Sequence, residues 1–382
     1  VYVGIAGHHI KSLQTRGDMV RQDPENEIQS SEIDTLIENQ RKTFIPAGDQ
    51  IIDVIPQDFH VDNIQNIKDP VGYNGVKVGA NFHIITGDRN AIRNINRAVE
   101  RSDLKTKDLV LQPLASASAV MSDIDLEAGV AILDIGGGTS DLAVFYDGIL
   151  KHTAVIPFGG ENITNDIRLG LGVLKQQAEA MKVQFGSALA DEAKANAFIT
   201  IPGLKGMQAK EISVKNLAQI IQARMSEILD FVSYHLKQVG LDSRALNGGI
   251  ILTGGGSQLK HLIQLTEYTT GLSARIGLPN EHLAPNHIEE LKKPMYATCL
   301  GLILKGCSDY ELKYKEFNEK YRKIEMPKKL KAEVEEPIVE QPKTEEPTTV
   351  DVTARKQKFA FWDKFKDNLI DLFKEEEDKI IR

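Results

Sequence analysis

One segment of this sequence places acidic residues and a hydroxyl around three consecutive glycines. Residues Ile132–Phe145 read ILDIGGGTSDLAVF, so Asp134 lies near the end of one apolar stretch, and Thr139 and Asp141 open the next. The glycines Gly136–Gly138 carry no Cβ, which lets successive backbone N–H groups converge on an anion. Thr139 adds a hydroxyl donor, and a carboxylate such as Asp134 beside bound phosphates can hold Mg²⁺ directly or through water. The pattern favours a phosphate site over a plain glycine-rich hairpin turn.

A second glycine run follows another apolar stretch about a hundred residues later. Residues Ile250–Leu259 read IILTGGGSQL, in which Gly254–Gly256 follow a strand-like segment and Ser257 has the character of a helix N-cap. Backbone without side chains allows a flat nucleoside to lie against it, and a helix N-terminus favours negative charge. Alone, this segment is equally typical of a strand–helix turn. Two such loops in one chain favour a nucleotide site.

The elements that must position these loops are strands alternating with helices. Val130–Ile135 and Leu142–Tyr146 predict a hairpin, and Gly249–Thr253 predicts a buried strand. Helical spacing of apolar residues predicts further segments, namely Val173–Phe185, Ser213–Val239 and a buried helix at Pro294–Leu304. Strands mixed with helices throughout predict the α/β class.

Length and composition limit the classes of protein that are possible. The chain has 382 residues, which suggests two or three domains, and its net charge of −8 argues against a general nucleic-acid binder. No uninterrupted apolar run reaches the roughly 18 residues of a spanning helix. Cys299 and Cys307 are too few for a disulfide framework, and we expect them to pack within an apolar helix. The first residue is Val1 rather than Met, and Val1–Ala6 reads as a core strand, so we expect the chain to start inside a domain.

The C-terminal part of the chain changes composition twice. Residues 309–356 include four prolines between Glu325 and Asp351 and almost no aromatics there, which predicts a disordered linker. Residues 357–382 then begin with an amphipathic segment whose apolar side chains share one stripe at 100° per residue. The aromatic and aliphatic residues assigned to this tail are Phe359, Trp362, Phe365, Leu369, Leu372 and Phe373.

This tail has two possible roles. A helix of this kind usually packs on its own protein, but a long linker separates this one from the folded part of the chain. Aromatic residues with adjoining basic residues suit a membrane interface, and the window Arg355–Lys366 carries five basic residues and one aspartate. We therefore expect the tail to bind an anionic membrane surface.

The pair of glycine loops resembles the phosphate-2 and adenosine motifs of the actin, DnaK-type chaperone and sugar-kinase superfamily. Within that superfamily the sequence is most similar to the FtsA family of bacterial cell-division proteins. The stretches that carry the resemblance are VGIAGHHI at Val3–Ile10, VIPQDFHVDNIQNIKDPVGYNG at Val54–Gly75, QPLASASAV at Gln112–Val120, GGENITNDI at Gly159–Ile167 and YATCLGLIL at Tyr296–Leu304.

The resemblance implies an α/β, actin-like bilobed fold with the small subdomain of the FtsA family. It places that subdomain at residues 1–80, the remainder of the first lobe at 81–129, the core of the second lobe at 130–158 and 246–308, and the outer subdomain of the second lobe at 159–245. The family also has a D-x-G-[ST] phosphate-1 loop ahead of the small subdomain, and nothing before Val1 supplies it. We therefore expect this chain to bind nucleotide weakly.

The resemblance also implies roles for single residues. It assigns phosphate contacts to Gly136–Thr139 and Asp141, and adenosine contacts to Gly254–Ser257. Glu179 and Lys182 match the helix that contacts ribose and adenine in relatives, although from their spacing alone they form a surface ion pair. Gln112 stands where relatives place the residue that positions an attacking water, and a loop-end glutamine with no such role is equally consistent. An amide orients water but is a poor base, so we expect slow hydrolysis at most.

The implied function is an ATP- and Mg²⁺-binding protein that tethers the division ring to the cytoplasmic face of the cell membrane at the septum. Its implied partners are the tail of FtsZ, other division proteins and further copies of itself in filaments, with no nucleic acid. Arg224 and Glu227 are candidates for the FtsZ-binding surface, against the simpler reading of a solvated pair. The alternatives are a small-molecule kinase or ATPase of the same superfamily and an FtsA-like pilus-assembly scaffold, neither of which accounts for the tail.

Overall fold

The computed structural model describes residues 1–194, 196–202, 208–241, 245–279, 283 and 288–322, with side chains as far as Leu312. The described residues belong to one compact unit, Val1–Lys323, and the second unit, Ile324–Arg382, lies outside them. Most of the predicted linker and the whole predicted tail therefore lie outside the described residues.

A five-stranded sheet carries both glycine loops. Its strands are β7 (Val130–Ile135), β8 (Ser140–Tyr146), β9 (Ile149–Ile156), β12 (Ile250–Thr253) and β13 (Ala274–Ile276), in the order β13-β12-β7-β8-β9. The strands β13, β12 and β7 run parallel, whereas β7, β8 and β9 form an antiparallel meander. Every residue of β7 and β12 is buried, as expected for strands covered on both faces. The predicted hairpin and buried strand are confirmed.

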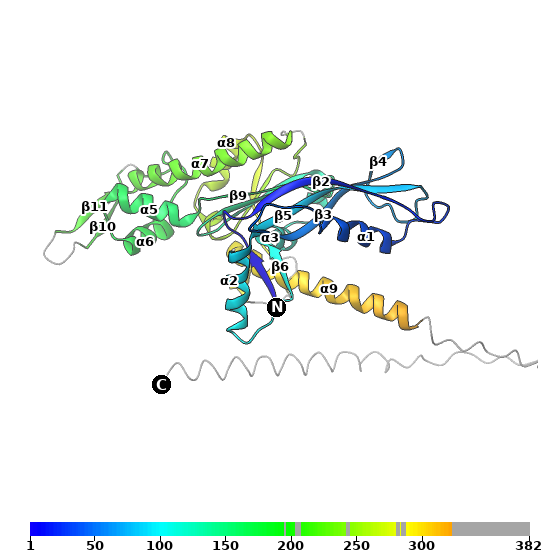
Figure 1. The fold of residues 1–382 in the computed structure, drawn as a ribbon. Helices are drawn as coiled ribbons and strands as arrows, with labels where there is room; N and C mark the ends of the chain where they lie inside the picture. The colour runs from blue at the N-terminus through cyan, green and yellow to red at the C-terminus, as the bar shows by residue number, and fades with distance from the viewer. Residues whose placement is uncertain (195, 203–207, 242–244, 280–282, 284–287, 323–382) are drawn as a thin grey trace, which may run out of the picture. The chain divides into compact units, whose positions relative to one another are not determined.

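Helices cover one part of this sheet and form its largest hydrophobic cluster. They are α5 (Gly160–Leu171), α6 (Lys175–Phe185), α7 (Val214–Val239) and α8 (Leu262–Thr270), with a hairpin of β10 (Phe198–Ile201) and β11 (Lys210–Ser213). Figure 1 shows α5, α6 and α7 in green beside that hairpin. The apolar residues of α7 recur every three or four positions, so one stripe from Leu217 to Leu236 is buried. Both helices predicted here are confirmed.

A second group of elements contains the beginning and the end of the unit. The parallel strands β1 (Tyr2–Ile5) and β6 (Asp108–Leu111) form a two-stranded sheet. The helices are α2 (Arg89–Glu100), α3 (Gln112–Val120), α4 (Asp123–Ala128) and α9 (Ala297–Arg322), with single turns η1 (Gly255–Gln258), η2 (Glu289–Lys292) and η3 (Pro294–Tyr296). The helices α3 and α9 cross at very short range, since a Cβ on Gly301 would lie 1.7 Å from the Ala115 carbonyl oxygen.

Several predictions for α9 are wrong. We placed the linker from residue 309, but α9 continues to Arg322. Residues 309–322 include three lysines, three glutamates and one arginine, which favour helices in spite of their polarity. Cys299 and Cys307 are exposed rather than packed, because a single face of α9, with Ala297 and Gly301, turns toward the interior. The predicted buried helix is therefore buried on one side only.

The small subdomain is a four-stranded antiparallel sheet with one helix and its own core. The strands β2 (Lys11–Val20), β3 (Asp49–Val61), β4 (Ile64–Ile67) and β5 (Lys77–Asp88) lie in the order β2-β5-β3-β4, beside helix α1 (Ser30–Gln40). Its hydrophobic cluster includes Phe82 and Leu36. The predicted bounds of 1–80 are wrong at both ends, because β1 pairs with β6 outside this sheet and β5 extends to Asp88.

The small subdomain contacts β9, the edge strand of the five-stranded sheet, mainly through main-chain oxygens. Gln57 Nε2 donates to the Leu150 carbonyl at 2.6 Å, and Gln14 Nε2 donates to the Lys151 carbonyl at 3.2 Å. His83 Nε2 lies 2.8 Å from Thr153 Oγ1 in the same interface. These polar contacts, together with the packing of Ile55 against the cluster that contains Leu150, fix the subdomain to the sheet.

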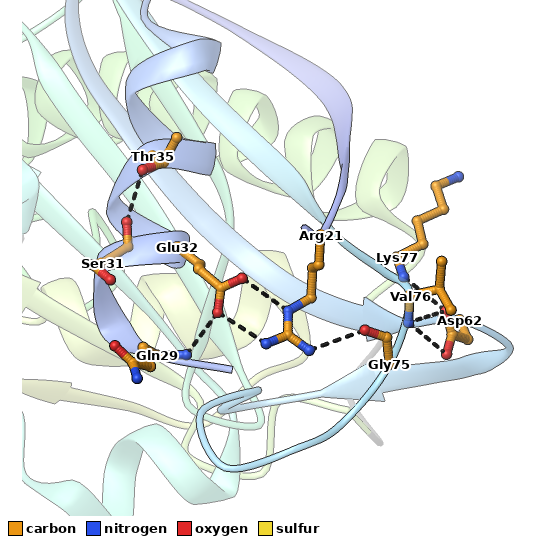
Figure 2. A network of polar contacts seen from close by, with 9 residues as sticks. All are labelled: Arg21, Gln29, Ser31, Glu32, Thr35, Asp62, Gly75, Val76 and Lys77. Atoms are coloured by element: carbon orange, nitrogen blue, oxygen red, sulfur yellow. Dashed lines mark hydrogen bonds and ion pairs between the residues drawn. The ribbon is translucent and has the colours of Figure 1, made fainter. Parts of the chain in front are cut away.

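A buried arginine organises one end of the small subdomain (Figure 2). The Arg21 side chain is only 1% exposed, and its guanidinium donates to both carboxylate oxygens of Glu32 at 2.9 and 3.1 Å and to the Gly75 carbonyl at 3.0 Å. Glu32 also accepts the Gln29 backbone N–H, which completes a capping box at the start of α1. One ion pair therefore joins the end of β2, the first turn of α1 and the loop before β5.

We predict that Glu32→Ala lowers the free energy of unfolding by about 3 kcal/mol, because it leaves the Arg21 guanidinium buried without its carboxylate. Urea unfolding measures this loss. Glu38→Ala in the same helix is the matched control: its ion pair with Arg41 is exposed on both sides, so its loss is below about 1 kcal/mol. Equal losses for the two variants would contradict the role given to Arg21.

Candidate functional site

Both glycine loops lie at the same edge of the five-stranded sheet. In the parallel pairing of β7 with β12, Asp134 stands opposite Thr253. The loop Gly136–Gly138 follows β7, and the loop Gly254–Gly256 follows β12. Because parallel strands end on the same side, the pairing brings together two sequence motifs more than a hundred residues apart, as a shared nucleotide site requires.

The glycines of the two loops serve two different purposes. Gly254 has a φ of +80° and a Cβ there would lie 2.3 Å from Asp134 Oδ1, while a Cβ on Gly256 would lie 2.3 Å from Ile135 Cγ2. Close packing therefore excludes a side chain at these two positions. At Gly137, Gly138 and Gly255, by contrast, a Cβ would meet nothing within 4 Å. Neither packing nor a positive φ requires glycine at these three positions. A phosphate or nucleoside lying directly against the backbone would require it, because a side chain would then be in the way.

The first turn of α5 holds the first loop in place. Gly160 N–H donates to the Gly136 carbonyl at 2.9 Å, and Glu161 N–H donates to the Gly137 carbonyl at 2.7 Å. Gly159 has no room for a side chain, because its Cβ would lie 2.7 Å from the Gly137 oxygen. These two N–H groups at the start of α5 are hydrogen-bonded to carbonyls of the loop, so α5 fixes the shape of the loop.

Glu179 and Lys182 lie beside this junction on α6. Lys182 Nζ donates to the Gly160 carbonyl at 2.9 Å and to Thr164 Oγ1 at 2.9 Å, and it pairs with Glu179 at 2.7 Å. Burial alone raises the pKa of Glu179, but the hydrogen bonds from Lys182 and Thr164 outweigh it and lower that pKa. The structure thus brings this pair next to the first glycine loop, as a binding role requires. Contact with ribose or adenine stays a prediction.

Two buried carboxylates face each other across β7 and β8. Asp134 and Asp141 are directly opposite in the antiparallel register and are 6% and 2% exposed. Asp134 Oδ2 accepts from Ser116 Oγ at 2.6 Å and from Thr298 Oγ1 at 3.1 Å. Asp141 Oδ2 accepts from Thr139 Oγ1 at 2.9 Å, whereas its Oδ1 is buried and has no hydrogen-bond partner among the described residues.

These surroundings disfavour the ionised form of both carboxylates. Burial raises the pKa of Asp134 in spite of its two hydrogen bonds. Burial, and then the neighbouring charge of Asp134, raises the pKa of Asp141 to about 7. A pair of carboxylates with an unpartnered oxygen fits Mg²⁺, which binds one or two protein carboxylates and keeps several of its waters. Within the described ranges, no three histidine, cysteine, aspartate or glutamate side chains converge to hold a metal by themselves.

Among the described residues, no hydrogen bond joins the Gln112 side chain to either glycine loop. It is the first residue of α3, and its Cγ lies 3.1 Å from the position of a Cβ on Gly4. Its helix nevertheless takes part in the site, because Ser116 lies one turn further along. The proposed water-positioning role of Gln112 stays a prediction.

Ser257 is not the N-cap that we predicted. It lies inside the single turn η1, is 2% exposed and donates its hydroxyl to the Gly254 carbonyl at 2.8 Å. The following helix α8 begins only at Leu262. A hydroxyl three residues from a carbonyl can close a local turn instead of capping a helix, and the sequence does not distinguish the two uses.

Arg224 forms ion pairs and a ring contact with other residues of this chain. Its Nε and Nη2 donate to the two carboxylate oxygens of Asp166 at 2.6 and 3.0 Å, and its guanidinium lies 5.0 Å from the centre of the Phe158 ring. It also pairs with Glu227, which is about half exposed. Arg224 therefore ties α7 to α5, and its proposed role in partner binding stays a prediction.

Sequence reasoning missed Ser116 and Thr298. Both hydroxyls lie in runs of small residues, which are typical of ordinary helix packing. Their common partner Asp134 is 18 positions from Ser116 and 164 positions from Thr298. The predicted membrane-contacting residues lie outside the described residues. Among the described helices, none combines the length and apolar composition that crossing a membrane requires.

Comparison with known proteins gives consistent matches along the chain. A family model described as Cell division protein FtsA matches residues 131–301, and one described as SHS2 domain inserted in FTSA matches residues 7–86. The chain is 36% identical over 307 residues to Cell division protein FtsA of Neisseria meningitidis serogroup B, covering 80% of this chain and 73% of that protein. It is 34% identical over 305 residues to Cell division protein FtsA of Pseudomonas aeruginosa, covering 80% and 72%.

A solved structure shares the fold at lower sequence similarity. A chain of the PilM–PilN type IV pilus biogenesis complex matches with a TM-score of 0.56 and 16% identity, covering 80% of this chain and 79% of that one. This likeness concerns the fold alone. Together with the family matches it confirms the predicted α/β, actin-like fold.

We predict that Asp141→Asn stabilises the chain at pH 8, measured without nucleotide or Mg²⁺. Between about pH 4 and pH 7 the folded chain keeps a proton on Asp141 that the unfolded chain has released, so stability falls as the pH rises. Asparagine has no proton to lose. Its advantage over the wild type therefore grows by about 1–3 kcal/mol between pH 4.5 and pH 8.

Urea unfolding at the two pH values checks this prediction. Asp191→Asn serves as the control, because that side chain is 99% exposed, and its effect is the same at both pH values. An Asp141→Asn effect that does not depend on pH would contradict the assigned protonation.

Proposed function

Because the chain belongs to the FtsA family of cell-division proteins, we propose that it binds ATP with Mg²⁺ and anchors the FtsZ ring to the cytoplasmic membrane. The observation that supports nucleotide binding best is the pair of glycine loops at one sheet edge, each with open space above bare backbone. The family supports a role in division. The membrane, FtsZ and filament roles are part of the proposal.

The residues of the site divide the work of holding a nucleotide. Gly136–Gly138 offer the triphosphate a backbone surface without side chains, and Thr139 adds a hydroxyl. In the second loop, Gly254–Ser257 would contact the adenosine. Lys182 adds a positive charge at the base of the first loop, and Glu179 orients it. Asp134 and Asp141 would hold Mg²⁺ directly or through water, and that ion would neutralise phosphate charge. Slow turnover is expected, since an amide such as that of Gln112 can orient water but is a poor base.

The proposed tether has two ends. At one end, the tail of FtsZ docks on the outer subdomain at residues 159–245, where Glu227 remains accessible on α7. At the other end, the segment Phe359–Phe373 lies in the membrane interface, because 15 helical residues extend only about 22 Å and cannot cross a hydrocarbon core of ~30 Å. Such an arrangement requires no catalysis, so ATP acts as a structural ligand or a switch. A kinase or ATPase of the same superfamily would instead turn over rapidly without a membrane.

We predict that Gly137→Val weakens ATP binding at least 100-fold, because its branched side chain fills the space where phosphate oxygens would lie. Isothermal calorimetry with ATP and Mg²⁺ on the full-length protein measures the loss. Gly137→Ala, with a smaller side chain, gives an intermediate loss. The thermal unfolding of both variants stays at the wild-type value, since a Cβ at this position would have no atom of the described residues within 4 Å. Unchanged affinity in Gly137→Val would remove the phosphate assignment.

We predict that the double variant Trp362→Glu and Phe365→Glu no longer co-sediments with anionic liposomes and still binds FtsZ. The substitutions place charges on the apolar stripe, whose burial at ~1.5–3 kcal/mol per large side chain drives binding. Gln357→Glu with Ala360→Glu is the control: it adds the same charge away from that stripe and retains most of the binding. Liposome binding by the first double variant in the absence of FtsZ would show that the tail is not the anchor.

A further inference from the structure

Three elements of the fold meet at one carboxylate oxygen. Asp134 Oδ2 accepts from Ser116 Oγ at 2.6 Å and from Thr298 Oγ1 at 3.1 Å, and the two hydroxyl oxygens are 2.8 Å apart. Ser116 belongs to α3, Thr298 to α9 and Asp134 to β7. Ser116 has no exposed surface, so this triangle of oxygens is closed to solvent on the α3 side.

The other oxygen of the same carboxylate lies toward the glycine loops. Asp134 Oδ1 lies 2.3 Å from the position of a Cβ on Gly254, the first glycine after β12. Asp134 therefore presents one oxygen to the crossing of α3 with α9 and the other to the edge of the sheet that carries both loops.

The crossing of the two helices has very little free space. A Cβ on Gly301 would lie 1.7 Å from the Ala115 oxygen, so the backbones of α9 and α3 touch. Ala115 precedes Ser116, and Gly301 lies one turn beyond Thr298 in the sequence. Because interiors are closely packed, the two hydroxyls cannot follow a shift of the carboxylate unless the helices also shift.

We propose that Ser116 and Thr298 are positioning residues, which fix the orientation of Asp134 and thereby couple the α3–α9 crossing to the Mg²⁺ bound with nucleotide. This inference rests on the proposed nucleotide site. Groups that hydrogen-bond to a metal-binding carboxylate commonly change metal affinity by 10–100-fold when they are removed. Coupling between sites is reciprocal, so Mg²⁺ at Asp134 also stabilises the crossing.

The test compares hydroxyl removal with hydroxyl retention. Thr298→Val removes the hydroxyl with little change in shape, Thr298→Ser keeps it, and Ser116→Ala removes the second donor. Ser118→Ala is the control on α3, because that hydroxyl donates to the Ala115 carbonyl and does not contact Asp134. Binding of a fluorescent ATP analogue to the full-length protein is titrated with MgCl₂ and repeated in EDTA.

The expected result is a change in Mg²⁺ dependence alone. Thr298→Val and Ser116→Ala raise the half-saturating Mg²⁺ concentration about tenfold or more, and their affinity in EDTA stays within about twofold of wild type. Thr298→Ser and Ser118→Ala behave as wild type. Hydrogen exchange gives a second readout: Mg²⁺ added to the ATP complex increases protection of the amides of α3 and α9 in the wild type and not in Thr298→Val.

Two outcomes would overturn the inference in different ways. If the wild type binds the analogue and Thr298→Val has the same Mg²⁺ dependence, or loses affinity equally with and without Mg²⁺, the hydroxyls are merely structural. If the wild type binds no nucleotide at all, the proposed function fails and this inference fails with it.

Discussion

The parallel pairing of β7 with β12 is the constraint on which the candidate site depends. It places the ends of two distant strands side by side, so that Asp134 stands opposite Thr253 and both glycine loops leave the sheet together. The close packing of Gly254 and Gly256 against Asp134 and Ile135 is possible only in this register. A slip of one residue would turn the buried side chains of either strand to the opposite face and separate the loops.

Within this frame, charge is buried in two contrasting ways. Arg21 and Glu32 neutralise each other with a bidentate contact, and the result is a rigid junction of three segments. Asp134 and Asp141 instead face each other as two carboxylates, and the donors that they have among the described residues are hydroxyls. The first arrangement is complete in itself. The second one is stable with a proton on one carboxylate or with a cation, which is the property expected of a binding site rather than of a core.

The sequence was sufficient for the features that depend on local pattern. The two glycine loops, the strands that lead into them and the long helix α7 could be predicted, because burial imposes a regular spacing on apolar residues. Features that depend on distant partners could not. The hydroxyls of Ser116 and Thr298 acquire a role only when α3 and α9 cross above β7, and the strand β1 finds its partner β6 across the whole small subdomain. The polar end of α9 was mistaken for linker, because helix propensity and low hydrophobicity occur together there.

The contact between the small subdomain and β9 depends more on the side chains of the subdomain than on those of β9. On one side the contacts come mainly from particular side chains, above all the amides of Gln57 and Gln14, while on the other side the acceptors are mostly main-chain oxygens of β9. Every residue has a carbonyl, so substitutions along β9 leave most of the acceptors in place, whereas the two glutamines have few adequate replacements. The position of the inserted subdomain therefore tolerates substitution along β9 better than substitution of these two glutamines.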